Sequence, residues 1–530
     1  PFTHGFAALA FIASLMVRLN TEGMLFSYPV RDASWMFFEA THLGMLALIT
    51  FFLFVPLIRY ALRTSFATAA KIMLFGFVMM PLPPIADKII MGSRPYISFY
   101  EFDGLRDLGR HFLTFFDRNP EMGLTYGPRI LTALVIIGMT IATYVATKKL
   151  FRAFTAGFLS YVILFVMGTL PSWLTLIIES SGKPLMEIGK LDIAGLFLTP
   201  SNLFERPPMD VMLVFNTKMS LMCAAILLPL VAFSFWREYR PICVALIRNA
   251  RLPQMVWHAG LVLLGMLLAS IFLGVSSSLS IFDILAVIIM VIAVESAWIA
   301  SVVTNDCYDT MIDAKTNPAR PLIEKTIHPE TYREIGMIFF VLSLILAGIV
   351  SFPAMFLLVC YQGLAWVYSA PPLRLKRIPG LATLIAAVAG ISVLFAGFVT
   401  VSPAQDLVGL PTSIVFFLLA AYAVSVPIKD FKDIAGDRAD HVFTIPVILG
   451  ADRAKLALGS LVFICYLMSP AVIGDRSLAI PALLFGSAAF WAMQRGTSDE
   501  TSPFSFRRMP AIILGITTVY GAVIAAMLFA

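Results

Sequence analysis

The sequence SIFDILAVIIMVIAVESAWIASVV (residues 280–303) runs directly into TNDCYDTMIDAKTNPARPL (residues 304–322). The first part is apolar for roughly 20 residues, the length at which a helix crosses the hydrocarbon core of a bilayer. The second part places Asp306, Asp309 and Asp313 at the end of that span. Because charged groups at membrane depth are costly, carboxylates clustered there indicate a function.

Apolar stretches of similar length recur along the whole chain. The protein has 530 residues, of which 59% are hydrophobic and 13% are charged, and its mean hydropathy is +0.88. Soluble globular proteins contain more charged residues, so the composition excludes that class. We expect an all-α, polytopic membrane protein with about 15 helical spans. The 5 cysteines and 6 histidines are dispersed, and we predict neither disulfides nor a histidine site.

The predicted spans fall into two groups. The carboxyl-terminal group contains nine spans, near residues 255–275, 281–304, 335–351, 353–370, 380–401, 411–429, 456–473, 478–494 and 509–529. The amino-terminal group contains roughly six, near residues 5–25, 41–58, 68–85, 130–147, 154–179 and 211–236. The basic segment REYRPICVALIRNARLP (237–253) separates them, and we divide the chain into domains of residues 1–250 and 251–530.

Lysine and arginine are distributed unevenly over the connections between spans. Most lie in connections on the same side as Asp309, whereas the opposite connections of the second domain (276–280, 402–410 and 474–477) contain only Arg476. Short loops rich in Lys and Arg face the cytoplasm. We therefore predict a protein of the cytoplasmic membrane whose acidic cluster opens toward the cytoplasm. The connections 26–40, 86–128 and 180–210 are then outside.

Residues 1–250 match no family signature. In one outer connection, GLRDLGRHFLTFFDR (104–118) has apolar residues at helical spacing and predicts a helix lying in the membrane interface. An extracytoplasmic active site, a docking surface for a protein partner and a lipid-handling module remain open for this domain, as do ordinary loop charges. The acidic residues that raise the first option are Glu22, Asp32, Glu39, Glu101, Asp103, Asp107, Asp117 and Glu121.

The polar residues that follow the 281–304 span have a helical spacing. Asn305, Asp309 and Asp313 recur at every fourth position and therefore share one face of a helix, with Asp306 close to it. Carboxylates this close repel one another unless cations lie between them. Hard oxygen ligands in this position favour Mg²⁺. The alternative is a solvated acidic loop that nearby Lys and Arg neutralise.

A second acidic group ends another span on the same predicted face. VPIKDFKDIAGDRADHVFTIPVILG (426–450) contains Asp430, Asp433 and Asp437. Acidic groups from two separate helices predict a clamp of two metal ions for a diphosphate.

A third segment supplies cations on that face. WVYSAPPLRLKRIPG (366–380) contains Tyr368, Arg374 and Lys376. Cations there would complete the charge balance of a leaving diphosphate. Positive-inside topology alone also accounts for basic residues in such a loop.

Together, NDCYDTMIDAKTNPARPL (305–322), YSAPPLRLKR (368–377) and KDFKDIAGDRADHVFTIPVILG (429–450) resemble the three signatures of the UbiA superfamily of intramembrane prenyltransferases. The resemblance covers roughly residues 250–530, and the predicted spans of this half match the family's fold in number. It implies a helical bundle around a central cavity, in which an isoprenyl diphosphate binds through Mg²⁺.

Carried over by position, the resemblance implies a role for each motif residue. The metal ligands would be Asn305, Asp306, Asp309, Asp313, Asp430, Asp433 and Asp437, and the diphosphate contacts would be Arg320, Tyr368, Arg374 and Lys376. Asp309, Asp433 and Lys376 would be catalytic. The implied reaction is ionisation of the allylic C–O bond, after which an aromatic or other membrane-borne acceptor attacks the carbocation.

Two other functions remain open. Some relatives transfer phosphoribose to a polyprenyl phosphate, but they carry a longer basic insertion than DAKTNPARPL (313–322). The other alternative is a non-catalytic, cation-binding membrane scaffold. The expected partners are an isoprenyl diphosphate donor, a hydrophobic acceptor and membrane lipids, with a protein partner for residues 1–250 as a further option. No nucleic acid partner is expected.

Overall fold

The structure, a computed structural model, describes residues 4–26, 33–92, 100–117, 123–200, 211–275, 279–378, 380–439 and 442–529. Asp32 and Glu121 lie outside these ranges. Apart from an isolated bridge between Thr497 and Ser505, every regular element of the described residues is a helix. The predicted all-α class is therefore confirmed.

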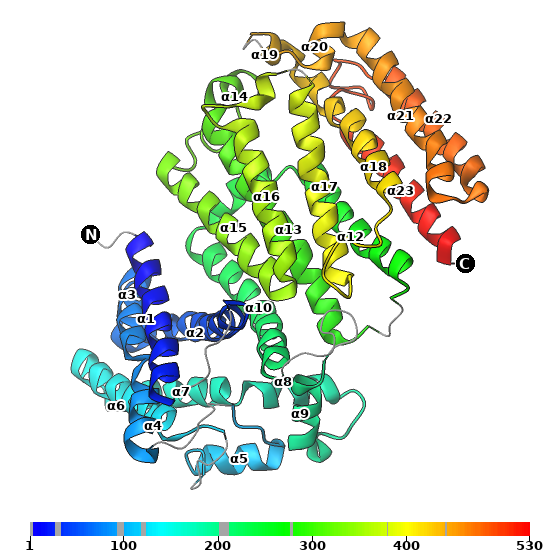
Figure 1. The fold of residues 1–530 in the computed structure, drawn as a ribbon. Helices are drawn as coiled ribbons and strands as arrows, with labels where there is room; N and C mark the ends of the chain where they lie inside the picture. The colour runs from blue at the N-terminus through cyan, green and yellow to red at the C-terminus, as the bar shows by residue number, and fades with distance from the viewer. Residues whose placement is uncertain are drawn as a thin grey trace. The chain divides into compact units, whose positions relative to one another are not determined.

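The chain folds as two compact units, residues 1–237 and 238–530 (Figure 1). The sequence predicts a boundary at residue 250, whereas the compact units meet at residue 237. Helix α11 (Arg240–Asn249) is part of the second unit, because its residues Ile242 and Leu246 pack against a core that contains Val303 and Tyr332.

The second unit is a bundle of long apolar helices. Nine of the 14 described segments that are long and apolar enough to cross a membrane belong to it, as the sequence predicts. Its elements after α11 are α12 (Leu252–Leu273), α13 (Ile281–Tyr308), α14 (Thr310–Thr316), α15 (Pro329–Val350), α16 (Phe352–Ser369), η3 (Leu375–Arg377), α17 (Leu381–Val401), α18 (Thr412–Ser425), η4 (Val426–Asp433), α19 (Ile434–Ala439), α20 (Ile445–Leu449), α21 (Ala451–Ile473), η5 (Arg476–Leu478), α22 (Ala479–Gln494) and α23 (Met509–Phe529).

Helix α17 lies inside this bundle and packs against α12, α16 and α18. Its contact with α12 depends on two glycines. A methyl group at Gly265 would lie 2.0 Å from the Leu394 carbonyl oxygen, and one at Gly397 would lie 2.0 Å from the Val262 carbonyl oxygen. The two backbones thus touch directly, as is typical of helices that associate in a membrane.

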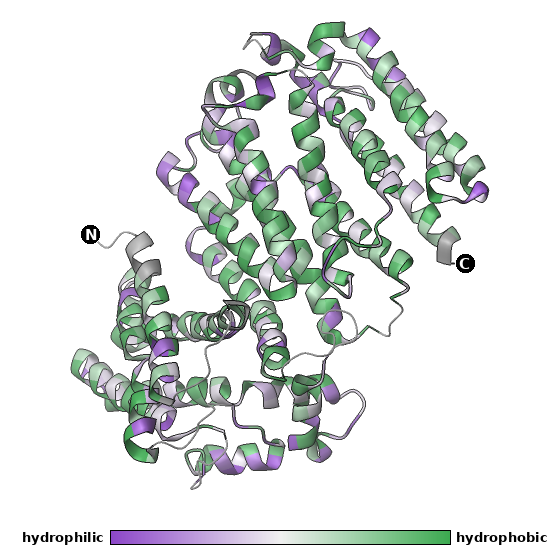
Figure 2. Ribbon diagram, viewed as in Figure 1, coloured by the Kyte–Doolittle hydropathy of each residue, from purple (hydrophilic) through white to green (hydrophobic). Residues whose placement is uncertain are grey.

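One end of this bundle is polar. Helices α14, α19 and α20 lie together there (Figure 1), and hydrophilic residues gather at that end while the helix bodies are hydrophobic (Figure 2). The short helices α14 and α19 contact each other. The acidic segments of the sequence are therefore at the same end of the bundle.

Among the described residues of the first unit, five segments are long and apolar enough to cross a membrane. Its elements are α1 (His4–Phe26), α2 (Ala33–Leu62), α3 (Phe66–Gly76), η1 (Phe77–Met79), α4 (Leu82–Met91), α5 (Leu105–Leu113), α6 (Tyr126–Thr147), α7 (Leu150–Gly168), α8 (Leu170–Glu179), η2 (Leu185–Glu187), α9 (Lys190–Leu198) and α10 (Val211–Glu238). The sixth predicted span, near 5–25, coincides with α1, which is not among those five.

The structure corrects one predicted span of this unit. The apolar stretch 154–179 is two helices, because α7 ends at Gly168 and α8 begins at Leu170. Pro171 stands in the first turn of α8, where its missing N–H group costs no hydrogen bond. Only α7 is long enough to span a bilayer.

The predicted interfacial helix 104–118 corresponds to α5. Its apolar face is covered by the unit itself: Leu108 is 1% exposed and Phe116 is 0% exposed, in a core with Phe165 and Leu176. Leu113, by contrast, is 85% exposed. Most of the apolar pattern in this segment therefore reflects packing within the protein.

Candidate active site

The first acidic segment keeps its three polar residues on one face although the helix is interrupted. Helix α13 ends at Tyr308, and Asp309 stands between α13 and α14. The Asp309 N–H donates to the Asn305 carbonyl at 3.0 Å, and the Asp313 N–H donates to the Asp309 carbonyl at 2.8 Å. Because this spacing continues through the break, the side chains of Asn305, Asp309 and Asp313 all reach the same cavity.

The second acidic segment approaches that cavity from another part of the chain. After α18 the backbone tightens into the 3₁₀ helix η4 and then continues as α19. Asp430, Asp433 and Asp437 lie along this segment and also line the cavity. The two acidic groups that the sequence singled out are therefore brought together at one site.

The cavity has a volume of about 370 Å³ and two kinds of wall. Besides the acidic residues, its polar wall contains Arg251, Asn317, Arg320, Tyr368, Lys376, Lys429 and Lys432. Its other wall contains aromatic and aliphatic side chains, among them Trp257, Trp298, Tyr361, Leu364, Ile385, Ala389, Tyr422 and Ile513. A polar region joined to an apolar region suits a ligand with a charged head and a hydrocarbon tail.

Basic side chains pair with the cavity carboxylates. Arg374 Nη2 lies 2.9 Å from Asp309 Oδ1, and Lys376 donates to Asp309 Oδ2. Arg320 Nε lies 3.8 Å from Asp313 Oδ1. The Asp309 side chain is thus held between two cations.

Further cations lie near the second acidic segment. Lys432 Nζ is 3.8 Å from Asp433 Oδ2, and Lys429 Nζ is 5.7 Å from the centre of the Tyr368 ring. The site therefore combines carboxylates, which suit a hard metal ion, with cations, which suit an anionic group such as a phosphate.

Two of the predicted site residues do not line the cavity. Asp306 is 1% exposed and accepts hydrogen bonds from Arg251 Nη2 (2.8 Å), Asn249 Nδ2 (2.6 Å) and the Tyr332 hydroxyl (2.9 Å). Arg374 is not part of the cavity lining but donates to Asp309, which is. The other predicted residues all line the cavity: Asn305, Asp309, Asp313, Arg320, Tyr368, Lys376, Asp430, Asp433 and Asp437.

Several lining residues were not among the predicted site residues. Lys429 and Lys432 are three positions apart within the second acidic motif, and Trp298 lies seven residues before Asn305. The seven-residue spacing puts Trp298 on the face already identified, and Lys429 lies four residues before Asp433, so a signal for these two residues was present in the sequence. Lys432 is next to Asp433 in the chain, and its spacing gave no such signal. Arg251 and Trp257 lie at the start of another helix, α12. Only the tertiary fold reveals that they line this cavity.

Comparisons with known proteins identify the family of the second unit. The model of the UbiA prenyltransferase family matches residues 262–514. The bacteriochlorophyll synthase 33 kDa chain of Rhodobacter capsulatus is 30% identical over 241 residues, which cover 42% of this chain and 75% of that protein. The chain belongs to the UbiA prenyltransferase family. The predicted family is thereby confirmed, and the second unit is called the UbiA domain below.

Two further known proteins are similar to part of this chain. Digeranylgeranylglyceryl phosphate synthase of Natronomonas pharaonis is 27% identical over 227 residues, which cover 41% of this chain and 78% of that protein. A solved UbiA homolog from Archaeoglobus fulgidus bound to GPP and Mg²⁺ is 17% identical and covers 53% of this chain and 99% of that chain, with a TM-score of 0.40. The first unit precedes the residues matched by the family model.

Proposed function

We propose that the UbiA domain transfers a prenyl group from an isoprenyl diphosphate to a hydrophobic, membrane-borne acceptor in a Mg²⁺-dependent reaction. The observation that carries this proposal is the shared cavity, in which two acidic segments and several cations meet an apolar wall. The carboxylates suit Mg²⁺, the cations suit a diphosphate, and the apolar wall suits a prenyl chain.

The carboxylates fit a hard divalent cation. Asp313 Oδ2 is buried and accepts no hydrogen bond from the part of the chain that the structure describes, so a lone pair is available there. Carboxylate and amide oxygens are the ligands that Mg²⁺ prefers. We assign Mg²⁺ binding to Asn305, Asp309, Asp313, Asp430, Asp433 and Asp437. Bound Mg²⁺ would neutralise part of the charge that develops on the leaving diphosphate.

The basic residues bind and orient the donor in this proposal. Lys376 and Arg374 already point at Asp309, and a diphosphate beside that carboxylate lies within their reach. Their positive charge stabilises the diphosphate as the C–O bond to the prenyl group breaks. The acceptor forms the new bond to the prenyl carbon and releases its proton. The apolar wall around Trp298 and Tyr361 keeps water from reaching the allylic cation.

The orientation follows from charge. The connections next to the acidic segments carry most of the Lys and Arg residues of the UbiA domain, so we propose that the site opens toward the cytoplasm. A thiol-reactive, membrane-impermeant label applied to intact cells tests this. A cysteine introduced at Asp452, an exposed residue at the start of α21, should stay unlabelled until the membrane is permeabilised.

The activity itself is tested with purified full-length protein. Isoprenyl diphosphates are supplied with a membrane lipid extract as acceptor, and we expect diphosphate release and a prenylated lipid in Mg²⁺, with neither in EDTA. Phosphoribosyl diphosphate with a polyprenyl phosphate forms the second arm. Transfer in that arm alone would replace prenyl transfer by phosphoribosyl transfer, and transfer in neither arm would favour a binding protein.

Proton competition predicts how the metal requirement depends on pH. Burial raises the pKa of Asp313 to about 6, although Arg320 acts in the opposite direction. Because the proton must leave before the carboxylate binds a cation, the Mg²⁺ concentration for half-maximal activity should rise below about pH 6, by up to about tenfold per pH unit. Mg²⁺ titrations of diphosphate release across this range measure it. The control is Asp313→Asn, whose metal requirement should be higher and should rise less steeply as the pH falls, because one titrating ligand has been removed. The same steep dependence in this variant would contradict the assignment.

A further inference from the structure

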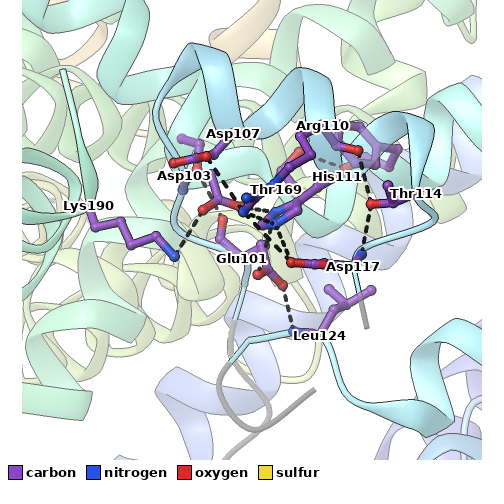
Figure 3. Close-up of polar contacts among 12 residues, drawn as sticks. Glu101, Asp103, Asp107, Arg110, His111, Thr114, Asp117, Leu124, Thr169 and Lys190 are labelled. Atoms are coloured by element: carbon purple, nitrogen blue, oxygen red, sulfur yellow. Dashed lines mark hydrogen bonds and ion pairs between the residues drawn. The ribbon is translucent and has the colours of Figure 1, made fainter. Parts of the chain in front are cut away.

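A second group of potential metal ligands lies in the first unit, which the family match does not include. Glu101, Asp103 and His111 point toward one another (Figure 3), and one ligand atom from each lies within 4.8 Å of the others. All three side chains are buried: Glu101 is 8% exposed, Asp103 0% and His111 3%. Two buried carboxylates this close to each other are costly unless a cation stabilises them.

The segment that carries the two carboxylates is fixed in place by the junction of α7 and α8. The Glu101 N–H donates to the Gly168 carbonyl at 3.1 Å. The Ser172 hydroxyl donates to the Glu101 carbonyl at 3.0 Å and accepts from the Asp103 N–H at 3.0 Å. These bonds hold both side chains toward His111, so the group is preorganised.

His111 lies in the last turn of α5, and its ring has carboxylates on both sides. Nδ1 contacts Asp103 Oδ2 and lies 3.7 Å from Glu101 Oε1. Nε2 lies 3.4 Å from Asp117 Oδ2 and 3.2 Å from Arg110 Nη2. A metal-binding histidine typically offers one ring nitrogen to the ion and donates the other N–H to an outer carboxylate, and Asp117 is close enough to Nε2 to be that carboxylate.

Lys190 supplies positive charge beside Asp103, at the edge of this group of ligands. Lys190 Nζ lies 3.1 Å from Asp103 Oδ1, an oxygen that accepts no hydrogen bond from the described residues. The Lys190 side chain is 63% exposed, so it can turn into water at little cost.

We propose that Glu101, Asp103 and His111 Nδ1 form a binding site for a divalent transition metal such as Zn²⁺ or Mn²⁺. One imidazole nitrogen and two carboxylate oxygens suit these ions better than Ca²⁺ or Mg²⁺, which take oxygen ligands. Ligands of a tetrahedral Zn²⁺ lie about 3.3 Å apart, close to the spacing of Nδ1 and Glu101 Oε1. Metal entry displaces the Nδ1 proton to solvent and separates this nitrogen from Asp103.

Zn²⁺ binding to the intact protein tests the site. Full-length protein in detergent is stripped with EDTA and then titrated with Zn²⁺ in excess Mg²⁺, which occupies the carboxylates of the UbiA domain. We expect one equivalent to bind, and His111→Gln and Glu101→Gln to weaken binding at least about tenfold. Asp107→Asn is the matched control, because Asp107 lies on the same helix with 44% of its side chain exposed and contacts Arg110 instead.

The outcomes separate this site from the UbiA domain. Asp433→Asn should leave Zn²⁺ binding unchanged, so a failed prenyl transfer assay does not affect the test. The proposal would be overturned if Asp433→Asn no longer bound the one equivalent of Zn²⁺, or if His111→Gln still bound it with wild-type affinity. Wild-type protein titrated with Co²⁺ gives a measurement that needs no variant. We expect a visible absorption band that Zn²⁺ abolishes, and absence of such a band would also overturn it.

Discussion

Asp309→Ala and Asp433→Ala should each reduce Mg²⁺-dependent prenyl transfer on the order of 10³-fold while the protein remains folded in detergent. The two aspartates come from separate parts of the chain and line one cavity. Either substitution removes a carboxylate from one side of the proposed metal clamp. Asp309→Ala also leaves Arg374 and Lys376 without their shared anion, so the positions of these two cations should change as well. Product formation at saturating Mg²⁺ measures the effect.

A matched control is available on α21. Asp452 pairs with Lys455 at 2.9 Å, but its side chain is 94% exposed and it does not line the cavity. Asp452→Ala should therefore keep full activity. Gel filtration and circular dichroism of all three variants establish that they are folded. Wild-type activity in either cavity variant would remove that aspartate from the metal clamp.

The sequence predicted the architecture of the UbiA domain well, because each span is a continuous apolar segment bounded by polar residues. Hydropathy was less informative in the first unit. The stretch 154–179 is apolar throughout, and only Pro171 signals that α7 ends and α8 begins within it. The apolar face of α5 could have faced lipid or protein, and only the buried positions of Leu108 and Phe116 decide between them.

Local spacing also predicted much of the candidate site. Asn305, Asp309 and Asp313 recur at every fourth residue, and the structure places all three in the cavity. Asp306 is adjacent to this pattern, but its partners Asn249 and Arg251 lie more than 50 residues earlier in the chain. Contacts at such a separation depend on helix packing and leave no periodic signal.

The contacts of His111 could not be predicted from the sequence for the same reason. His111 is a single histidine in an amphipathic helix, and nothing in its immediate sequence distinguishes it from an ordinary packed residue. Its closeness to Glu101 and Asp103 depends on how residues 100–104 are fixed by Ser172 and the Gly168 carbonyl. A metal site built by tertiary contacts therefore appears only in the fold.

Asp306→Ala should destabilise the UbiA domain by about 3–5 kcal/mol, because it removes one partner of a buried charge pair. Asp306 Oδ1 pairs with Arg251 at 2.8 Å, and Oδ2 accepts bonds from Asn249 and Tyr332. Arg320 Nε also lies 4.0 Å from Oδ1. The substitution leaves Arg251 without this partner and Tyr332 without the acceptor that Asp306 provides, so we expect a lower midpoint of thermal unfolding in detergent.

Thermal unfolding distinguishes this structural role from the metal-ligand role that the sequence motif implies. A metal ligand facing the cavity would lose activity on substitution with little change in the unfolding midpoint measured without Mg²⁺. Asp306→Asn refines the comparison, because the amide keeps an oxygen for Tyr332 but removes the charge that pairs with Arg251. Its unfolding midpoint should lie between those of wild type and Asp306→Ala. An unchanged unfolding midpoint in both variants, together with lost activity, would show that Asp306 is a metal ligand and contradict its structural role.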